Sequence, residues 1–330
     1  MKSIVCFALF TGVIAEVMIR PSDHVMAGAK HDFLRVAGDK EINTEDNPFI
    51  HHIKHPGDVP IDANFETNFW GVVDFKPVPK FSIDTHDPML QDIFISGSVH
   101  YGSEQWDRSV WDALVLILQK ASLNRPSVMV DVGANLGYFS LAAAALGAHV
   151  IAFEPMSRNA RKFAKSIHKN HFEGSVTLFQ NIVWDDIPSF RMKLEATSFL
   201  NQGNGKTLEA AVGARGLYGV DFVSTVSLSD ELHRGVDVLK INTEGTEGAV
   251  IEGAKSLICE YKVSYIIMEF TEIKKRKGKY SALETLTFLQ SIGYSVSDIT
   301  PDAPPLTISD YLNFPPNLLF SLQGLGAVCV

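Results

Sequence analysis

The sequence predicts an α/β fold in which a parallel sheet is covered by helices on both faces. From about residue 126, short apolar runs rich in Val and Ile alternate with longer segments of helical periodicity, as in successive βαβ units. The first apolar run leads directly into a glycine-rich turn, and the second ends at an acidic residue. The composition, 46% hydrophobic and 20% charged in 330 residues, excludes a disordered, collagen-like or coiled-coil chain.

The N-terminus predicts a secretory signal peptide over residues 1–15. Lys2 precedes an uncharged run from Ile4 to Ala15, and Val13 and Ala15 are the small residues that a signal peptidase recognises. The run is too short to span a membrane, so we expect no stable membrane anchor. The alternative is a buried N-terminal helix. The signal predicts localisation to the secretory pathway or outside the cell.

Residues 16–79 show little periodicity and contain many Asp, Asn, Pro and His residues, which predicts an irregular polar arm. His51, His52 and His55 would share a helix face, but they have no Cys or carboxylate partner in register. We therefore interpret them as part of a polar linker and predict no metal site. The three cysteines show no metal-ligand spacing, and Cys259 and Cys329 either pair or remain free thiols.

Residues 80–125 predict a cap in front of the larger domain. Strand-like stretches occur at Phe81–Ile83 and Gln91–Ile95, and Trp106–Lys120 has the spacing of an amphipathic helix.

The domain from 126 to 330 contains seven predicted strands with helices between them. The strands are Val128–Val132, His149–Phe153, Val176–Phe179, Val236–Ile241, Ser264–Met268, Tyr294–Val296 and Leu318–Leu322. The helices are Tyr138–Leu146, Met156–Lys169, Val250–Glu260 and Ala282–Ile292. Residues 184–222 are rich in Gly and Asn without a clear period, which predicts an inserted hairpin or loop.

The predicted chemistry lies where the strands end. Asp131, Gly133 and Gly137 surround the first turn, and Glu154 ends the next strand, where a carboxylate can accept both hydroxyls of a ribose. The turn lacks the Gly-x-Gly-x-x-Gly pattern that cradles a pyrophosphate. Because like charges repel, Asp131 suits a cationic ligand such as S-adenosylmethionine better than a phosphate. The alternative is that Asp131 only caps the turn.

Three blocks carry a resemblance to a known family. Val128–Ser140 reads VMVDVGANLGYFS, Val150–Pro155 reads VIAFEP, and Val238–Glu247 reads VLKINTEGTE. Together they resemble the signature blocks of the FkbM family of S-adenosylmethionine-dependent methyltransferases, over about residues 81–330. The resemblance implies a Rossmann-like class I methyltransferase sheet of order 3-2-1-4-5-7-6 with strand 7 antiparallel, and methylation of a hydroxyl oxygen on a small molecule or sugar.

The resemblance also implies site residues. Near the methionine end of the cofactor it places Asp131, Gly133, Ala134, Asn135 and Gly137. Glu154 would hold the ribose, and Asn181 and Ile182 would pack against the adenine.

One position departs from the family. Its usual Asp-x-Glu-Gly has Asn242 in place of the Asp, and an amide cannot take a proton from an alcohol. Glu244 is therefore the predicted general base, with Glu247 and Glu104 as further candidates and His100 as a titratable alternative. Lys240 is predicted to be a structural or substrate-orienting cation. The alternative for Glu244 is a residue that caps the following turn.

The charge distribution bears on partners. A net charge of −9 argues against nucleic-acid binding, so a small-molecule or glycan acceptor is expected. The basic run at residues 274–279 either holds an acidic acceptor or is a solvated loop.

The leading hypothesis for the function is an O-methyltransferase. A non-catalytic binding module and a nicotinamide oxidoreductase are the alternatives, and the oligomeric state stays open.

Overall fold

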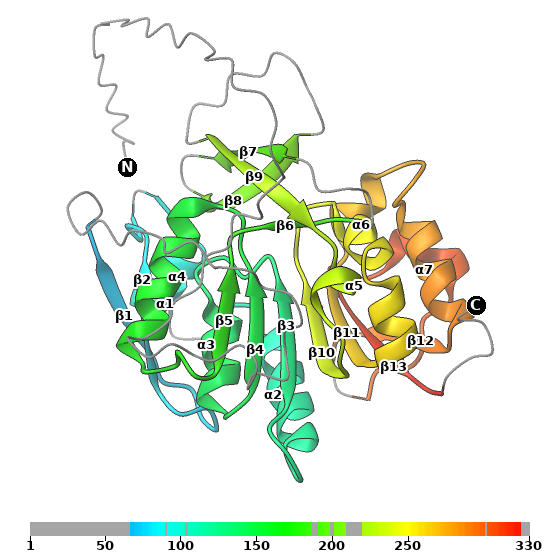
Figure 1. Cartoon of the computed structure of the whole chain (residues 1–330), viewed down its shortest axis with the longest axis horizontal. Coiled ribbons are helices and arrows are strands. Elements are labelled where there is room, and N and C mark those ends of the chain that lie inside the picture. The colour runs from blue at the N-terminus through cyan, green and yellow to red at the C-terminus, as the bar shows by residue number, and fades with distance from the viewer. Residues whose placement is uncertain are drawn as a thin grey trace, which may run out of the picture. The chain divides into compact units, whose positions relative to one another are not determined.

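A computed structural model describes residues 67–330 except 90, 103–104, 186–190, 199–200, 209–219, 301 and 325–330. Seven strands form the central sheet in the order β12-β13-β11-β10-β3-β4-β5 (Figure 1). Their bounds are β3 Val128–Val132, β4 His149–Phe153, β5 Val176–Phe179, β10 Val236–Ile241, β11 Val263–Glu269, β12 Tyr294–Asp298 and β13 Asn317–Leu322. Only β13 pairs antiparallel with its neighbours in this sheet. Counted along the chain, the order is 3-2-1-4-5-7-6 with strand 7 antiparallel, which confirms the predicted class I methyltransferase fold.

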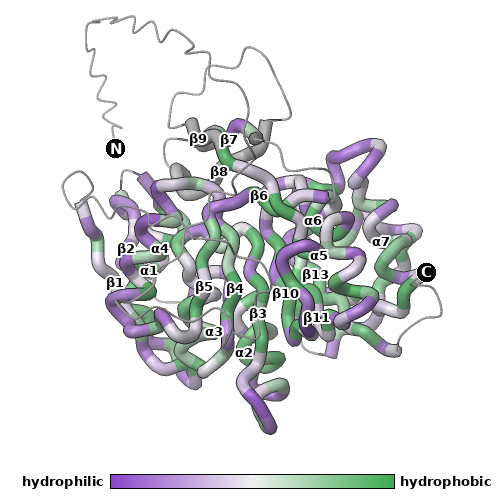
Figure 2. The backbone as a smooth tube through the Cα atoms, in the orientation of Figure 1, coloured by the Kyte–Doolittle hydropathy of each residue, from purple (hydrophilic) through white to green (hydrophobic). Residues whose placement is uncertain are grey.

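Successive residues of each central strand belong to hydrophobic cores on opposite faces of the sheet, as in Met129 and Val130 or Val238 and Leu239. Buried strands therefore read as mainly apolar runs, as Figure 2 shows for β3, β4 and β10. The charged exceptions are Asp131 in β3 and Asp237 and Lys240 in β10. One core contains α2 Arg108–Ala121, α3 Tyr138–Ala145 and α4 Ser157–Lys169. The other contains α5 Leu228–Glu231, α6 Glu247–Glu252 and α7 Ala282–Ser291.

The cap differs from its prediction in two places. Strand β1 (Phe69–Val73) lies in the stretch assigned to the polar arm and pairs antiparallel with β2 (Phe81–Thr85). The strand predicted at Gln91–Ile95 is wrong. The Asp92 carboxylate accepts hydrogen bonds from the backbone N–H groups of Phe94 and Ser96, which turns the chain into helix α1 (Ile95–Tyr101).

The insertion forms a sheet of its own, which confirms the predicted hairpin. Its order is β6-β9-β7-β8, with β6 Ile182–Val183, β7 Arg191–Ser198, β8 Asn201–Leu208 and β9 Val220–Val226. This sheet lies above the carboxyl ends of β3, β4 and β5 (Figure 1).

The helix predicted over Val250–Glu260 is divided into α6 and a π-helical turn at Leu257–Tyr261. Between them, a Cβ on Gly253 would lie 1.8 Å from the Trp184 carbonyl oxygen, so only glycine fits this contact with the insertion.

Two glycines of the first turn are required by close packing. At Gly133 the backbone φ is +79°, and an added Cβ would lie 1.9 Å from the carbonyl oxygen of Asn242 at the end of β10. At Gly137 the φ is +81°, and a Cβ would meet the ring of Phe163 at 2.2 Å. The turn can therefore approach both β10 and α4 only with glycine at these positions.

Candidate functional site

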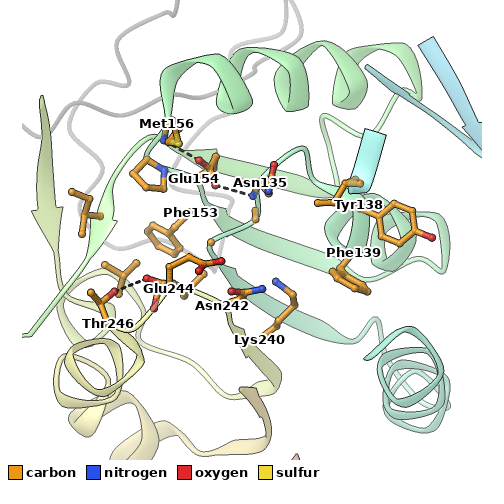
Figure 3. A pocket seen from close by; sticks show the side chains of 18 of the residues that line it. Asn135, Tyr138, Phe139, Phe153, Glu154, Met156, Lys240, Asn242, Glu244 and Thr246 are labelled. Carbon is orange, nitrogen blue, oxygen red and sulfur yellow. Dashed lines mark hydrogen bonds between the residues drawn. The ribbon is translucent and has the colours of Figure 1, made fainter. Parts of the chain in front are cut away.

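A cavity of about 290 Å³ opens where the carboxyl ends of β3, β4 and β10 meet the insertion. Figure 3 shows that Asn135, Glu154 and Met156 lie on one side of it, while Lys240, Asn242 and Glu244 lie on the other. The first group follows β3 and β4, and the second belongs to the end of β10 and the loop after it. Ligands of open α/β sheets bind at this edge, so the strand order places the cavity where a ligand is expected.

The glycine-rich turn and Glu154 form one hydrogen-bonded unit. The backbone N–H of Asn135 donates to Glu154 Oε2 at 2.8 Å, and the backbone N–H of Met156 donates to Oε1 at 2.9 Å. Gly133 and Ala134 donate their N–H groups to the Phe153 carbonyl oxygen. These N–H groups are used inside the protein, so the turn offers no cradle for a pyrophosphate.

Glu154 is 4% exposed and lines the cavity. Burial raises the pKa of its carboxyl to about 7, although the hydrogen bonds from Met156, Asn135 and Asn159 favour the ionised form. The nearby charge of Asp131 adds to the upward shift in the pKa. The carboxylate is thus fixed in orientation and titrates near neutral pH.

Asn181 and Ile182, the residues predicted to pack against an adenine, form another part of the cavity wall. The Asn181 side-chain nitrogen donates to the Ser224 carbonyl oxygen at 3.1 Å, while its Oδ1 is buried without a hydrogen-bond partner. Asn135 Oδ1 is likewise buried and unpartnered. Ile182 packs with Met156 in one hydrophobic cluster. This part of the wall therefore contains apolar surface and two amides whose buried oxygens have no hydrogen-bond partner within the protein.

Glu244, in the loop after β10, and Glu247, at the start of α6, have different surroundings. Glu244 lines the cavity, is partly exposed, and has a left-handed backbone with φ +57°. Glu247 is fully buried and does not line the cavity. Its Oε1 accepts hydrogen bonds from the Thr243 N–H and hydroxyl and from the Gly245 N–H. Glu247 therefore orders the loop that carries Glu244.

Asp131 and Gly137 do not line the cavity. Asp131 is fully buried, with its Oδ1 2.9 Å from Lys240 Nζ and its Oδ2 accepting from the Ser140 hydroxyl at 2.7 Å. Lys240 faces Asp131 directly across the β3–β10 register, and its ammonium lies 5.2 Å from the Phe139 ring centroid. The carboxylate predicted to face a cationic ligand is instead paired with a lysine of the neighbouring strand.

Several lining residues have no counterpart in the sequence prediction. They are Phe94 and Trp106 from the cap, Phe139 from α3, and Leu194 from the insertion. Cap and insertion thus both contribute apolar surface to the cavity. The aromatic residues of the predicted cap helix were the only sign in the sequence of this apolar wall. Their contact with the cavity could not be predicted, because no spacing rule relates them to the strand ends.

Of the remaining candidates, His100 alone belongs to the described residues. Glu104, His51, His52 and His55 fall outside the described residues. His100 does not line the cavity, and its Nε2 lies 2.9 Å from the Thr85 hydroxyl. In the part of the chain that the structure describes, no group of three or more His, Cys, Asp or Glu side chains could hold a metal ion. No described helix is both long and apolar enough to cross a membrane.

The basic run at residues 274–279 is largely occupied by contacts within the chain. Lys274 donates to the Phe314 carbonyl oxygen, Lys275 pairs with Glu272, and Lys279 pairs with Asp185 at 3.0 Å. Arg276 donates to the Gly245 carbonyl oxygen at 3.4 Å and lies over the Tyr280 ring. These contacts connect the loop after β11 to the insertion and to the Glu244 loop.

Comparison with known protein families shows which family the chain belongs to. The family model described as the methyltransferase FkbM domain matches residues 131–296. The chain belongs to the FkbM methyltransferase family. The match begins at Asp131 and includes Glu154, Asn181 and Glu244, while the cap residues that line the cavity precede it.

Solved structures give more distant likenesses. A methyltransferase FkbM from Methylobacillus flagellatus KT has 15% sequence identity and a TM-score of 0.37, and the match covers 69% of this chain and 66% of that one. The chain thus spans slightly less than two thirds of that protein. An O-methyltransferase from Bacillus cereus, solved in complex with SAH, has 10% identity and a TM-score of 0.36 over 70% of this chain and 86% of that one. A search of curated proteins returns no match.

Proposed function

We propose that this FkbM-family chain is an S-adenosylmethionine-dependent O-methyltransferase that acts on a hydroxyl group of a small molecule or glycan. The observation that carries the proposal is the anchoring of Glu154 at the cavity by the glycine-rich turn, because this unit presents an oriented carboxylate to a ribose diol. The cofactor would supply an electrophilic methyl group on its sulfonium.

The lining residues fit this cofactor. The unpartnered Oδ1 of Asn181 can accept from the amino group of an adenine, and the cluster of Met156 and Ile182 offers apolar surface to the ring. The Asn135 Oδ1 is a further acceptor close to Glu154. The absence of free N–H groups in the turn at 133–135 disfavours a nicotinamide dinucleotide, whose pyrophosphate needs them.

Glu244 is the proposed general base. It lies on the side of the cavity opposite Glu154 in Figure 3, and its carboxylate can accept the proton that an acceptor hydroxyl loses during transfer. Glu247 and Arg276 fix the loop that carries it. Asn242, also at the cavity, can donate or accept a hydrogen bond but cannot remove the proton.

A non-catalytic binding module is the second candidate, and Asn242 in place of the family's acid is the observation that favours it. Both candidates require cofactor binding, so a binding measurement tests what they share. Methyl transfer to a panel of polyol, glycan and lipid acceptors separates them, because a binding module forms no methylated product.

We expect S-adenosylhomocysteine to bind wild-type protein and Glu154→Gln to weaken its binding, because the amide loses one acceptor oxygen for the ribose. Calorimetric titration of both proteins would measure this. Wild-type protein that shows no binding would contradict the proposal. Glu252→Gln, a change on the outer side of α6, serves as the control and should bind like wild type.

The same titration should depend on pH. The ionised Glu154 accepts the ribose hydroxyls, so affinity is full above a pKa of about 7 and falls by about tenfold from pH 8 to pH 6. The ligand 5′-methylthioadenosine keeps the ribose and adenine but lacks the titratable α-amino and α-carboxyl groups of the homocysteine part, so its pH dependence reports the protein alone. In Glu154→Gln the affinity for it should be weak and independent of pH.

Residues 1–15 are proposed to direct the chain into the secretory pathway. Cys259 is disulfide-bonded, which fits an oxidising compartment. If the signal is read as proposed, a C-terminally tagged chain expressed in a secreting cell reaches the medium and begins after Ala15. N-terminal sequencing of the tagged protein measures this, and retention of Met1 on a cytosolic product would contradict it.

A further inference from the structure

A line of buried polar side chains connects the cap to Glu154. His86 follows strand β2, and its Nε2 lies 2.8 Å from Oδ1 of Asn159, in the first turn of α4. The Asn159 side-chain nitrogen in turn donates to Glu154 Oε1 at 3.3 Å. His86 and Asn159 are both fully buried. These contacts connect the cap, 73 residues before Asn159 in the sequence, to the carboxylate proposed to hold the ribose.

The direction of the hydrogen bonds fixes the state of His86. Because the Asn159 nitrogen donates to Glu154, its Oδ1 must accept, and His86 therefore carries its proton on Nε2. Burial lowers the pKa of His86, and the charges of Lys162 and Arg158 lower it further, against the opposing effects of the hydrogen bond to Asn159 and the charge of Asp92. His86 is consequently a neutral imidazole with an N–H fixed toward Asn159.

The backbone of His86 is also fixed. Its N–H donates to the Ser96 hydroxyl at 3.2 Å, and that hydroxyl donates to Asp92 Oδ2 at 2.7 Å. Asp92 lines the cavity and holds the turn that carries Phe94. The cap is thus tied to two parts of the cavity wall, one through Asn159 and Glu154 and the other through Ser96 and Asp92.

We propose that His86 and Asn159 are positioning residues that hold Glu154 in the orientation needed to bind the ribose of the cofactor. This inference rests on the proposed cofactor. Met156 and Asn135 donate backbone N–H groups to the carboxylate, and Asn159 adds the only side-chain donor to it among the described residues. Without Asn159, Oε1 loses one of its two donors, and the carboxylate gains freedom to rotate away from the ribose.

Calorimetric titration of S-adenosylhomocysteine at pH 8 tests the proposal. His86→Leu and Asn159→Leu are expected to weaken binding by about 3- to 10-fold, the effect of losing one hydrogen bond. His86→Gln, whose amide can donate to Asn159, should bind like wild type. Thr85→Val is the matched control. Thr85 is equally buried in the adjoining strand, and it bonds the Phe69 carbonyl oxygen and His100 rather than the path to Glu154.

A Glu154→Gln background separates positioning from general damage to the fold. If His86 acts through Glu154, His86→Leu should weaken binding in the wild-type background and have little further effect in Glu154→Gln. Equal losses in both backgrounds, or a loss in Thr85→Val as large as in His86→Leu, would overturn the proposal. Wild-type protein that does not bind would overturn the proposed cofactor itself, which is a separate outcome.

A measurement on wild-type protein does not depend on any variant folding. Nitrogen-15 NMR of the histidine side chains should show one ring that is neutral and protonated on Nε2 at pH 8, and its signals should be missing in His86→Gln. A His86 ring that carries its proton on Nδ1, or on both nitrogens, at pH 8 would contradict the proposed path.

Discussion

Replacing Glu244 with glutamine is expected to lower the rate of methyl transfer by a factor of about 10² to 10⁴, the contribution of a positioned general base. Glutamine keeps the shape of the side chain and its place on the cavity wall, but its amide cannot take the proton of the acceptor hydroxyl. Asn242 cannot replace it for the same reason. Cofactor affinity should change little, because Glu244 lies on the side of the cavity opposite Glu154 (Figure 3).

The measurement is formation of S-adenosylhomocysteine from labelled cofactor with an acceptor that the wild-type protein methylates. Glu252→Gln is the control, since Glu252 lies on α6, which follows the Glu244 loop, and pairs with Lys255 without lining the cavity. Wild-type activity in Glu244→Gln would remove Glu244 from the mechanism. Cofactor binding by wild-type protein without transfer to any acceptor would favour the binding module instead.

The sequence predicted the central sheet well because buried parallel strands are mainly apolar runs and their ends carry glycine or acidic residues. Val128–Val132 and Glu154 are examples in which local pattern and final position agree. Strand β1 was missed because Phe69–Val73 is short and exposes alternate residues at a sheet edge. The strand predicted at Gln91–Ile95 failed because the Asp92 side chain competes for the backbone N–H groups there.

The site was predictable only in part, for a different reason. The turn and Glu154 follow one another along the chain, so their proximity can be read from spacing. The contact of His86 with Asn159 depends on how α4 packs against β2, and the pairing of Asp131 with Lys240 depends on the register of β3 and β10. No local pattern specifies either relation. Four carboxylates, at 131, 154, 244 and 247, were therefore predicted to gather around one ligand, and the structure buries two of them, Asp131 and Glu247, away from the cavity wall.

The Asp131–Lys240 pair has a consequence for charge at the cavity. Lys240 lines the cavity, and a lone ammonium there would repel a cationic cofactor. Asp131 is fully buried and 2.9 Å from that ammonium, so the pair presents no net charge. A buried carboxylate of this kind is stable only while its partner remains, because removing one member of the pair leaves an uncompensated charge.

Lys240→Met is accordingly expected to lower the free energy of unfolding by about 3 to 5 kcal/mol, since Asp131 would retain only the hydrogen bond from Ser140. The double variant Asp131→Asn/Lys240→Met should recover most of this loss, because it removes both charges and the amide oxygen still accepts from Ser140. Urea denaturation of the wild type, the single variant and the double variant measures the effect, and both the midpoint and the dependence of the unfolding free energy on urea concentration are compared.

As a control, Lys255→Met breaks the pair with Glu252, whose side chains are 39% and 36% exposed, and should lower the free energy of unfolding by less than about 1 kcal/mol. Equal losses in Lys240→Met and Lys255→Met would show that burial does not set the strength of the Asp131 pair, and the assignment of Asp131 as the residue that neutralises Lys240 would then fail.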